Sequence, residues 1–133
     1  MRINYRRWGV FNLVGLAGFV VQIAAIALLT RWFDWPAPIA TAVALEVAAL
    51  QNFIGHSRWT WRDRPTAPNI RGWLRRYWRY QAAKTASLAA NLAITTLIVE
   101  GGLPPEVANT AAVLVCAVPN FLVSEHLVFR QAS

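Results

Sequence analysis

The stretch WGVFNLVGLAGFVVQIAAIALLT, which spans residues 8–30, decides the fold class of this chain. It contains no charged residue, and before Thr30 its strongly polar side chains are Asn12 and Gln22. A helix rises ~1.5 Å per residue, so ~20 such residues cross the hydrocarbon core of a bilayer, which is ~30 Å thick. The stretch therefore predicts a membrane-spanning helix over about residues 10–30.

Three more apolar stretches follow, and they predict helices over about residues 37–56, 80–99 and 106–124. None of the four shows the wide polar stripe of a soluble amphipathic helix. Of the 133 residues, 56% are hydrophobic and only 14% are charged, which is too little charge to cover the surface of a soluble domain. We expect an all-α membrane protein with four transmembrane helices in a single domain over residues 1–133.

The positive charges of the chain fall on one side of these four helices. There are 13 Lys and Arg residues against 6 Asp and Glu, a formal net charge of +7. If the N-terminus lies in the cytoplasm, every basic residue except Arg31 belongs to an inner segment, as the positive-inside rule requires. We therefore expect both termini inside. The positive charge is therefore explained by the orientation of the helices in the membrane. No separate basic soluble domain remains that could bind nucleic acid.

The segment between the second and third helices is the one sizeable loop, and its second part has a helical pattern. It begins after Pro68 with Asn69, a residue type that commonly caps helices. Ile70, Trp73, Leu74 and Tyr77 then recur at helical spacing, with Arg71, Arg75 and Arg79 on another face. The pattern predicts a short interfacial helix on the inner leaflet. Two interpretations stay open: anchoring by anionic lipid, or recognition of a lipid phosphate or an acidic partner.

The inner ends of the second and fourth helices carry the same pattern at an offset of 68 residues. One reads Asn52-Phe53-Ile54 followed by Trp59, Trp61 and Arg62, and the other reads Asn120-Phe121-Leu122 followed by Leu127, Phe129 and Arg130. Each half of the chain is then a helical hairpin that starts inside. The halves are predicted to be two tandem hairpins related by an axis along the membrane normal.

Glu46 is expected close to the bilayer midplane, where an ionised carboxylate costs at least ~2.5–3.5 kcal/mol. It should therefore face the bundle interior or a wet cavity, either protonated or paired with Lys84, Gln22 or Asn91. Two interpretations stay open here as well. Glu46 either forms a structural hydrogen bond between helices or serves function, as intramembrane acids commonly do.

Polar side chains also gather at the inner ends of the helices. Asn52 and Asn120 either bond across the two hairpins or line a headgroup site. His56 follows Asn52 by one turn, and we expect it in solvent or against a phosphate group. Arg58 and Arg62 reach the same depth, and guanidinium groups suit phosphate oxygens in charge and geometry. The full set of candidate substrate-binding residues is Gln22, Glu46, Asn52, His56, Arg58, Arg62, Lys84, Asn91 and Asn120.

The sequence carries no pattern for covalent chemistry. The single Cys excludes an intrachain disulfide framework and a Cys-rich zinc site. A phosphate-binding G-x-x-x-x-G-K-[ST] loop and a His-Glu-x-x-His pattern are both absent from the sequence. We therefore expect a protein that is not an enzyme and has no catalytic residue, metal ligand or cofactor.

Several of these motifs together resemble the GtrA-like family. Glu46, Gln51-Asn52-Phe53-Ile54 and Arg58-Trp59-Thr60-Trp61 match its second helix, in which an acid precedes Asn-Phe and a basic-Trp-Thr-aromatic ending. Asn120-Phe121-Leu122 with Val128-Phe129 is similar to the end of its fourth helix, and residues 11–15 are similar to the start of its first. The resemblance covers nearly the whole chain.

The resemblance implies a small four-helix protein of the bacterial inner (cytoplasmic) membrane that flips polyprenyl-phosphate-linked sugars. The cargo would be a monosaccharide carried to the outer leaflet for modification of a cell-envelope polysaccharide. An alternative is a membrane anchor that recruits a polyprenyl-phosphate glycosyltransferase, and a third hypothesis is a proton-coupled exporter of small cations. Four short helices leave little room for a sugar-sized path, so we expect a homo-oligomer or a groove open to membrane lipids.

Overall fold

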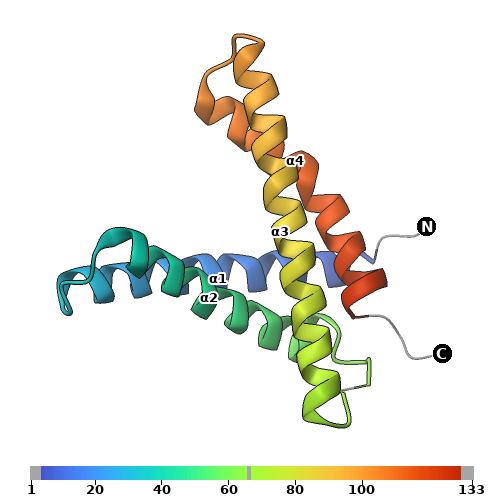
Figure 1. The fold of residues 1–133 in the computed structure, drawn as a ribbon. Helices are drawn as coiled ribbons and strands as arrows, with labels where there is room; N and C mark the ends of the chain where they lie inside the picture. Colours follow the sequence, from blue (N-terminus) through green and yellow to red (C-terminus); the bar gives the residue numbers. More distant parts are fainter. Residues whose placement is uncertain (1–3, 66, 130–133) are drawn as a thin grey trace. The chain divides into compact units, whose positions relative to one another are not determined.

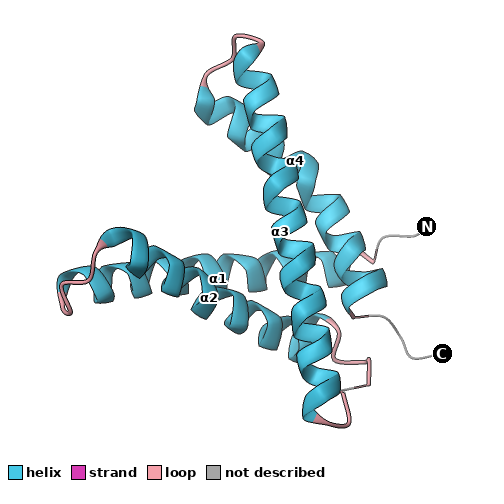
Figure 2. Ribbon diagram, in the orientation of Figure 1, coloured by secondary structure: helices cyan, strands magenta, loops and turns pink. Residues whose placement is uncertain are grey.

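The computed structural model describes residues 4–65 and 67–129, and every regular element in these ranges is helical (Figure 1 and Figure 2). In chain order the elements are α1 (Tyr5–Arg31), α2 (Ala37–Gly55), the π-helical turn η1 (His56–Thr60), α3 (Ile70–Glu100), α4 (Pro105–Val123) and the π-helical turn η2 (Ser124–Val128). Four helical segments are long and apolar enough to cross a membrane: Tyr5–Arg31, Ala37–Thr60, Ile70–Glu100 and Pro105–Val128. The predicted all-α class with four transmembrane helices is confirmed.

The chain divides into two compact units, residues 1–64 and 65–133, and each unit contains one helical hairpin. In the first unit α1 packs along α2 and against η1. In the second unit α3 packs along α4 and against η2. The tandem arrangement of two hairpins is as the repeated sequence pattern predicts.

Asparagine caps fix where the first helix of each hairpin begins. The side-chain oxygen of Asn4 accepts a hydrogen bond from the backbone N–H of Arg7 at 3.1 Å. Asn69 accepts one from the backbone N–H of Gly72 at 2.8 Å, so its predicted role as a cap is confirmed. Each cap satisfies one of the N–H groups that a helix leaves without a partner at its start.

The short helix predicted in the 2–3 loop is not a separate element, and its position at the membrane interface stays a prediction. Residues 70–79 are helical, but they form the first part of α3, which runs without interruption for 31 residues. No Gly or Pro lies between Trp73 and Glu100 to break the helix. At ~1.5 Å per residue α3 is ~46 Å long, which exceeds the ~30 Å hydrocarbon core of a bilayer.

Small residues let the two helices of each hairpin approach closely. Ala40, Ala44 and Ala48 of α2 are buried at intervals of four residues, and Ala108 and Ala112 hold the equivalent positions in α4. Such spacing places the small side chains on one face of a helix. Large aromatic side chains close the packing at the far end, and those less than 2% exposed are Phe53, Trp61, Phe121 and Phe129.

The second helix of each hairpin has the same length and the same kind of final turn. α2 and α4 each have 19 residues, and a five-residue π-helical turn continues each of them. The same hydrogen bond closes both turns, from the Trp61 N–H to the His56 carbonyl and from the Phe129 N–H to the Ser124 carbonyl, each 2.9 Å long. The π-helical turns are therefore a repeated feature of the fold.

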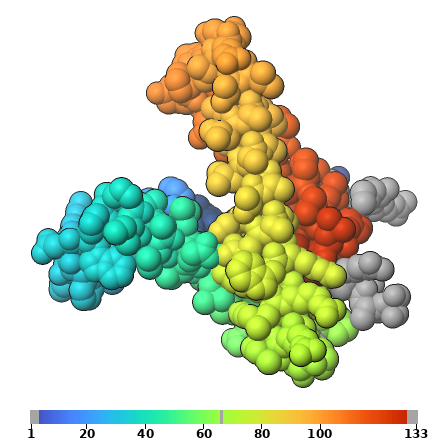
Figure 3. Space-filling view, viewed as in Figure 1, coloured from blue at the N-terminus to red at the C-terminus, as the bar shows by residue number. Residues whose placement is uncertain are grey.

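Much of the surface of each hairpin is apolar. Leu13, Leu88 and Leu114 are each more than 60% exposed, and many other aliphatic side chains of the four helices point outward as well. The space-filling view shows the α3–α4 hairpin as a slender pair of helices with its side chains on the outside (Figure 3). In a bilayer these side chains contact hydrocarbon, so their exposure carries no hydrophobic penalty.

Candidate functional site

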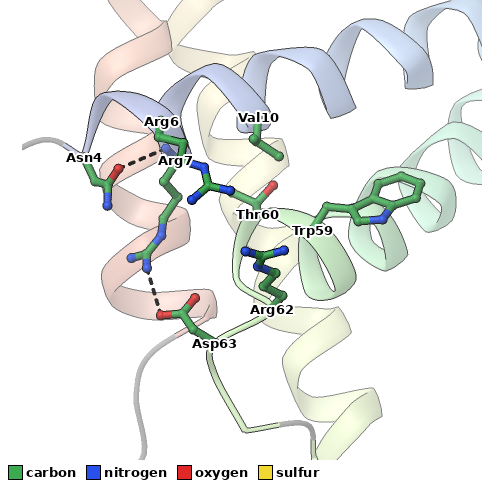
Figure 4. Close-up of a pocket in the computed structure, with 8 residues that line it drawn as sticks. All are labelled: Asn4, Arg6, Arg7, Val10, Trp59, Thr60, Arg62 and Asp63. Atoms are coloured by element: carbon green, nitrogen blue, oxygen red, sulfur yellow. Dashed lines mark hydrogen bonds and ion pairs between the residues drawn. The ribbon is translucent and has the colours of Figure 1, made fainter.

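A pocket of about 470 Å³ lies in the first hairpin, where the start of α1 meets the end of η1 (Figure 4). Its lining residues are Asn4, Arg6, Arg7, Val10, Trp59, Thr60, Arg62 and Asp63. Three of these eight side chains are guanidinium groups and one is a carboxylate. The pocket is therefore cationic and is lined by a hydroxyl and an indole as well.

Two sequence segments bring the arginines together. Asn4 caps α1, so Arg6 and Arg7 occupy its first turn. Arg62 follows the π-helical turn η1, which packs against α1. In Figure 4 the guanidinium groups of Arg6 and Arg62 extend toward the space beside Thr60. The first turn of a helix also presents the positive end of the helix dipole, which favours an anion at this place.

The three arginines of the pocket differ in their ion-pair partners. Arg7 donates to a carboxylate oxygen of Asp63 at 2.9 Å, with the two side chains 18% and 49% exposed. Arg6 and Arg62 are exposed, and neither has an ion-pair partner within residues 4–65 and 67–129. Two guanidinium groups are thus available to an anionic group that enters the pocket.

A buried aromatic cluster supports the floor of the pocket. The ring of His56 stacks on Phe11 with 4.6 Å between ring centroids and meets the edge of Trp61 at 5.5 Å. Its Nδ1 lies 3.0 Å from the hydroxyl oxygen of Thr60, within hydrogen-bond distance. The solvated position expected for His56 is wrong, because these rings leave it only 3% exposed. His56 holds Thr60, which lines the pocket, and does not line it itself.

Asn52 lies one turn before His56 and faces α1 of its own hairpin. A Cβ added at Gly18 would overlap the Asn52 carboxamide, so the absence of a side chain at Gly18 makes room for it. The Asn52 Oδ1 atom is buried, and it has no hydrogen-bond partner in the described part of the chain. A polar atom placed this way is an acceptor site for a water or a ligand hydroxyl.

The remaining predicted residues are spread along the helices. Glu46 is exposed on α2, and Gln22 is half-buried on α1 of the same hairpin. Lys84 and Asn91 of α3 and Asn120 of α4 are half-buried in the second hairpin. Glu46 therefore does not face the packed interior of its own hairpin, and its predicted pairing stays a prediction.

Of the nine residues predicted to bind substrate, Arg62 alone lines the pocket. Arg58 is exposed on η1 but does not line the pocket. Sequence reasoning assigned Arg6 and Arg7 to membrane topology and gave no role to Asp63. The sequence does contain one indication that these arginines lie near one another, because Arg6-Arg7 and Arg62 fall at the same predicted end of one hairpin.

In the second hairpin, Arg76 of α3 makes contacts of a different kind from those of Arg7. Arg76 donates to the carbonyl oxygen of Pro65 at 3.0 Å, and its guanidinium carbon lies 6.0 Å from the centre of the Phe129 ring. Leu127 and Val128 stand where the first hairpin has Trp59 and Thr60. Arg130, the predicted counterpart of Arg62, lies outside the described residues.

Comparison with known proteins gives a family assignment. A family model described as "GtrA/DPMS, transmembrane domain" matches residues 10–129, which is most of the chain. No curated protein sequence matches the chain. Within residues 4–65 and 67–129, no three His, Cys, Asp or Glu side chains are grouped so that they could hold a metal ion.

Proposed function

The chain belongs to the GtrA/DPMS transmembrane-domain family, and on that premise we propose that it moves a polyprenyl-phosphate-linked monosaccharide across the bilayer. The movement runs from the cytoplasmic to the outer leaflet of the bacterial inner membrane and supplies the sugar for modification of a cell-envelope polysaccharide. Members of this family are in general non-catalytic membrane proteins, so the proposed activity breaks and forms no covalent bond.

The arginine pocket of the first hairpin is the observation that carries this proposal. A phosphate group and a sugar cannot cross hydrocarbon unaided, because their hydrogen bonds to water would not be replaced. Arg6 and Arg62 offer two guanidinium groups that have no ion-pair partner among the described residues, at the end of the hairpin that the positive-inside rule predicts to lie in the cytoplasm. They would hold the phosphate of the lipid-linked sugar, since guanidinium groups bind phosphate oxygens in a bidentate manner.

The rest of the cargo would follow the polar side chains toward the bilayer midplane. Glu46 and Gln22 of the first hairpin carry oxygen and nitrogen atoms that can bond sugar hydroxyls at that depth. The polyprenyl chain would stay in lipid beside the exposed apolar faces of the helices. An arginine-lined pocket suits anionic cargo, which disfavours an exporter of small cations.

Purified protein in vesicles that contain a fluorescent polyprenyl-phosphate sugar tests the proposal. Glu46→Gln removes the intramembrane charge, and we expect slower transfer with an unchanged amount of folded protein. Glu106→Gln is the matched control, because Glu106 is an exposed acid in the first turn of α4. Transfer at the wild-type rate in the Glu46 variant would contradict the role of Glu46, and no transfer by the wild-type protein would contradict the function.

A second candidate function rests on the first part of α3. Arg71, Arg75 and Arg79 are exposed there at intervals of four residues, and form a basic stripe. Such a stripe suits a protein that anchors or recruits a glycosyltransferase. Reversing these charges to Glu should then abolish co-purification with the enzyme and leave vesicle transfer unchanged. Loss of transfer without loss of co-purification would favour the flippase.

A further inference from the structure

Asp63 is the one acid among the described side chains that line the arginine pocket. It follows Arg62 directly, just after η1, and its carboxylate pairs with Arg7 at 2.9 Å. The Asp63 side chain is 49% exposed, whereas that of Arg7 is 18% exposed. The acid is thus the partner that can turn away into solvent, and the arginine is the partner held in place.

The carboxylate occupies a position that suits a ligand phosphate. Carboxylate and phosphate groups present similar oxygen acceptors to a guanidinium fork. A phosphate that enters the pocket meets Arg6 and Arg62, which have no ion-pair partner in the part of the chain that the structure describes, but it finds Arg7 already paired. It also meets the negative charge of Asp63, which repels it.

We propose that Asp63 holds Arg7 in the empty pocket as a stand-in for ligand, and that an incoming phosphate monoester or diester displaces it. Displacement frees the Arg7 nitrogen that Asp63 engages, so that Arg7 joins Arg6 and Arg62 around the phosphate. Asp63 also limits how tightly the phosphate is held, because its carboxylate competes for the same guanidinium group. The proposal rests on the proposed function only in taking this pocket as the place where the cargo phosphate binds.

Equilibrium binding to the full-length protein in neutral detergent micelles tests the proposal. The probes are inorganic phosphate, a short-chain polyprenyl phosphate and the matching polyprenol without phosphate, each titrated by calorimetry. Asp63→Asn should bind a phosphate-bearing probe about three- to fivefold more tightly, as expected for loss of a partly exposed competing charge. Polyprenol binding should not change.

Asp34→Asn is the matched control. Asp34 is an exposed acid in the loop between α1 and α2, and its φ of 53° is in the left-handed region that Asn also tolerates. This variant removes one negative charge far along the hairpin from the pocket, and its phosphate affinity should equal that of the wild-type protein. Asp63→Glu keeps a carboxylate and should also bind as the wild-type protein does. Circular dichroism checks the helix content of every variant.

The outcomes separate this inference from the proposed function. A gain for both phosphate probes supports the inference with the phosphate group as sufficient ligand, and a gain for the lipid probe alone supports it with a lipid headgroup as ligand. Unchanged or weaker binding by Asp63→Asn, an equal gain in Asp34→Asn, or no phosphate binding by the wild-type protein overturns it. If Asp63→Asn binds more tightly but vesicles show no transfer, the inference stands and the proposed function fails.

Discussion

Gly18 of α1 lies directly against the carboxamide of Asn52 of α2, so closely that a Cβ at Gly18 would overlap it. The contact joins the two helices of the first hairpin one turn away from His56, which supports the pocket floor. Asn52 therefore contributes to helix packing, and its buried Oδ1 atom stays without a hydrogen-bond partner among the described residues. Glycine at position 18 is needed for close approach, and its backbone conformation is ordinary α-helix.

Gly18→Ala should destabilise the first hairpin, because the new methyl group must push the Asn52 carboxamide aside. Overpacking of this kind costs about 1–2 kcal/mol, which thermal denaturation in micelles, followed by circular dichroism, can measure. Gly15→Ala is the control, since a Cβ at Gly15 meets nothing within 4 Å. In an Asn52→Ala background the effect of Gly18→Ala should largely disappear. Equal effects of the Gly15 and Gly18 substitutions would contradict this account of the contact.

Thr60→Val should destabilise the protein by about 1–3 kcal/mol, because it leaves the buried His56 Nδ1 atom without its hydroxyl partner. Thr110→Val is the control: Thr110 is exposed and its hydroxyl bonds a backbone carbonyl of its own helix. Adding His56→Phe to Thr60→Val should restore most of the lost stability, since neither of the two positions then carries a buried polar side-chain atom. The denaturation midpoints of the three variants test this prediction. A double variant that is no more stable than Thr60→Val would contradict the role of the His56–Thr60 hydrogen bond.

The architecture could be predicted from sequence because it depends on local properties. The length of each apolar stretch gives a span, and the matching patterns at Asn52 and Asn120 give two hairpins of the same build. The continuity of α3 was missed, because the mixture of Arg and Trp at residues 71–79 was interpreted as a surface segment. Hydrophobicity marks what can lie in lipid, but it does not mark where a helix ends.

The pocket could not be predicted, because it depends on contacts between distant parts of the chain. Arg7 and Asp63 are 56 positions apart, and only the packing of α1 against η1 brings them to 2.9 Å. The same packing buries His56, because Phe11 of α1 covers its ring. A side chain at the end of a predicted span is solvated or buried according to its neighbours on the other helix, and a single helix does not show them.

Arg6→Gln and Arg62→Gln should each weaken the binding of a polyprenyl phosphate by about fivefold, as expected for loss of one partly solvated charge contact. Arg31→Gln is the control, because Arg31 is exposed at the other end of α1 and does not line the pocket. Raising the ionic strength from 0.01 to 0.15 M shortens the screening length from about 30 to about 8 Å, so wild-type affinity should also fall. Calorimetric titration measures both effects. Equal losses in the Arg31 and Arg62 variants would show that net charge, and not the pocket, attracts the lipid.

The predicted orientation of the chain can be tested with single cysteines, because the sequence has only Cys116, and this residue is half-buried. In a Cys116→Ser background, cysteines at the exposed positions of Tyr5 and Ile70 report the side where α1 and α3 begin. Cysteines at Phe33 and Leu103 report the two connecting loops.

With both termini in the cytoplasm, a membrane-impermeant thiol reagent added to intact cells should label the loop positions and spare the helix starts. Inverted membrane vesicles should give the opposite result, since they present the cytoplasmic face to the reagent. The physical reason is the concentration of basic residues around the start of α1, between the hairpins and in the first part of α3, because these residues resist translocation. Labelling of position 5 in intact cells would place the arginine pocket on the outer face, where it would receive cargo after transfer and could not capture it from the cytoplasm.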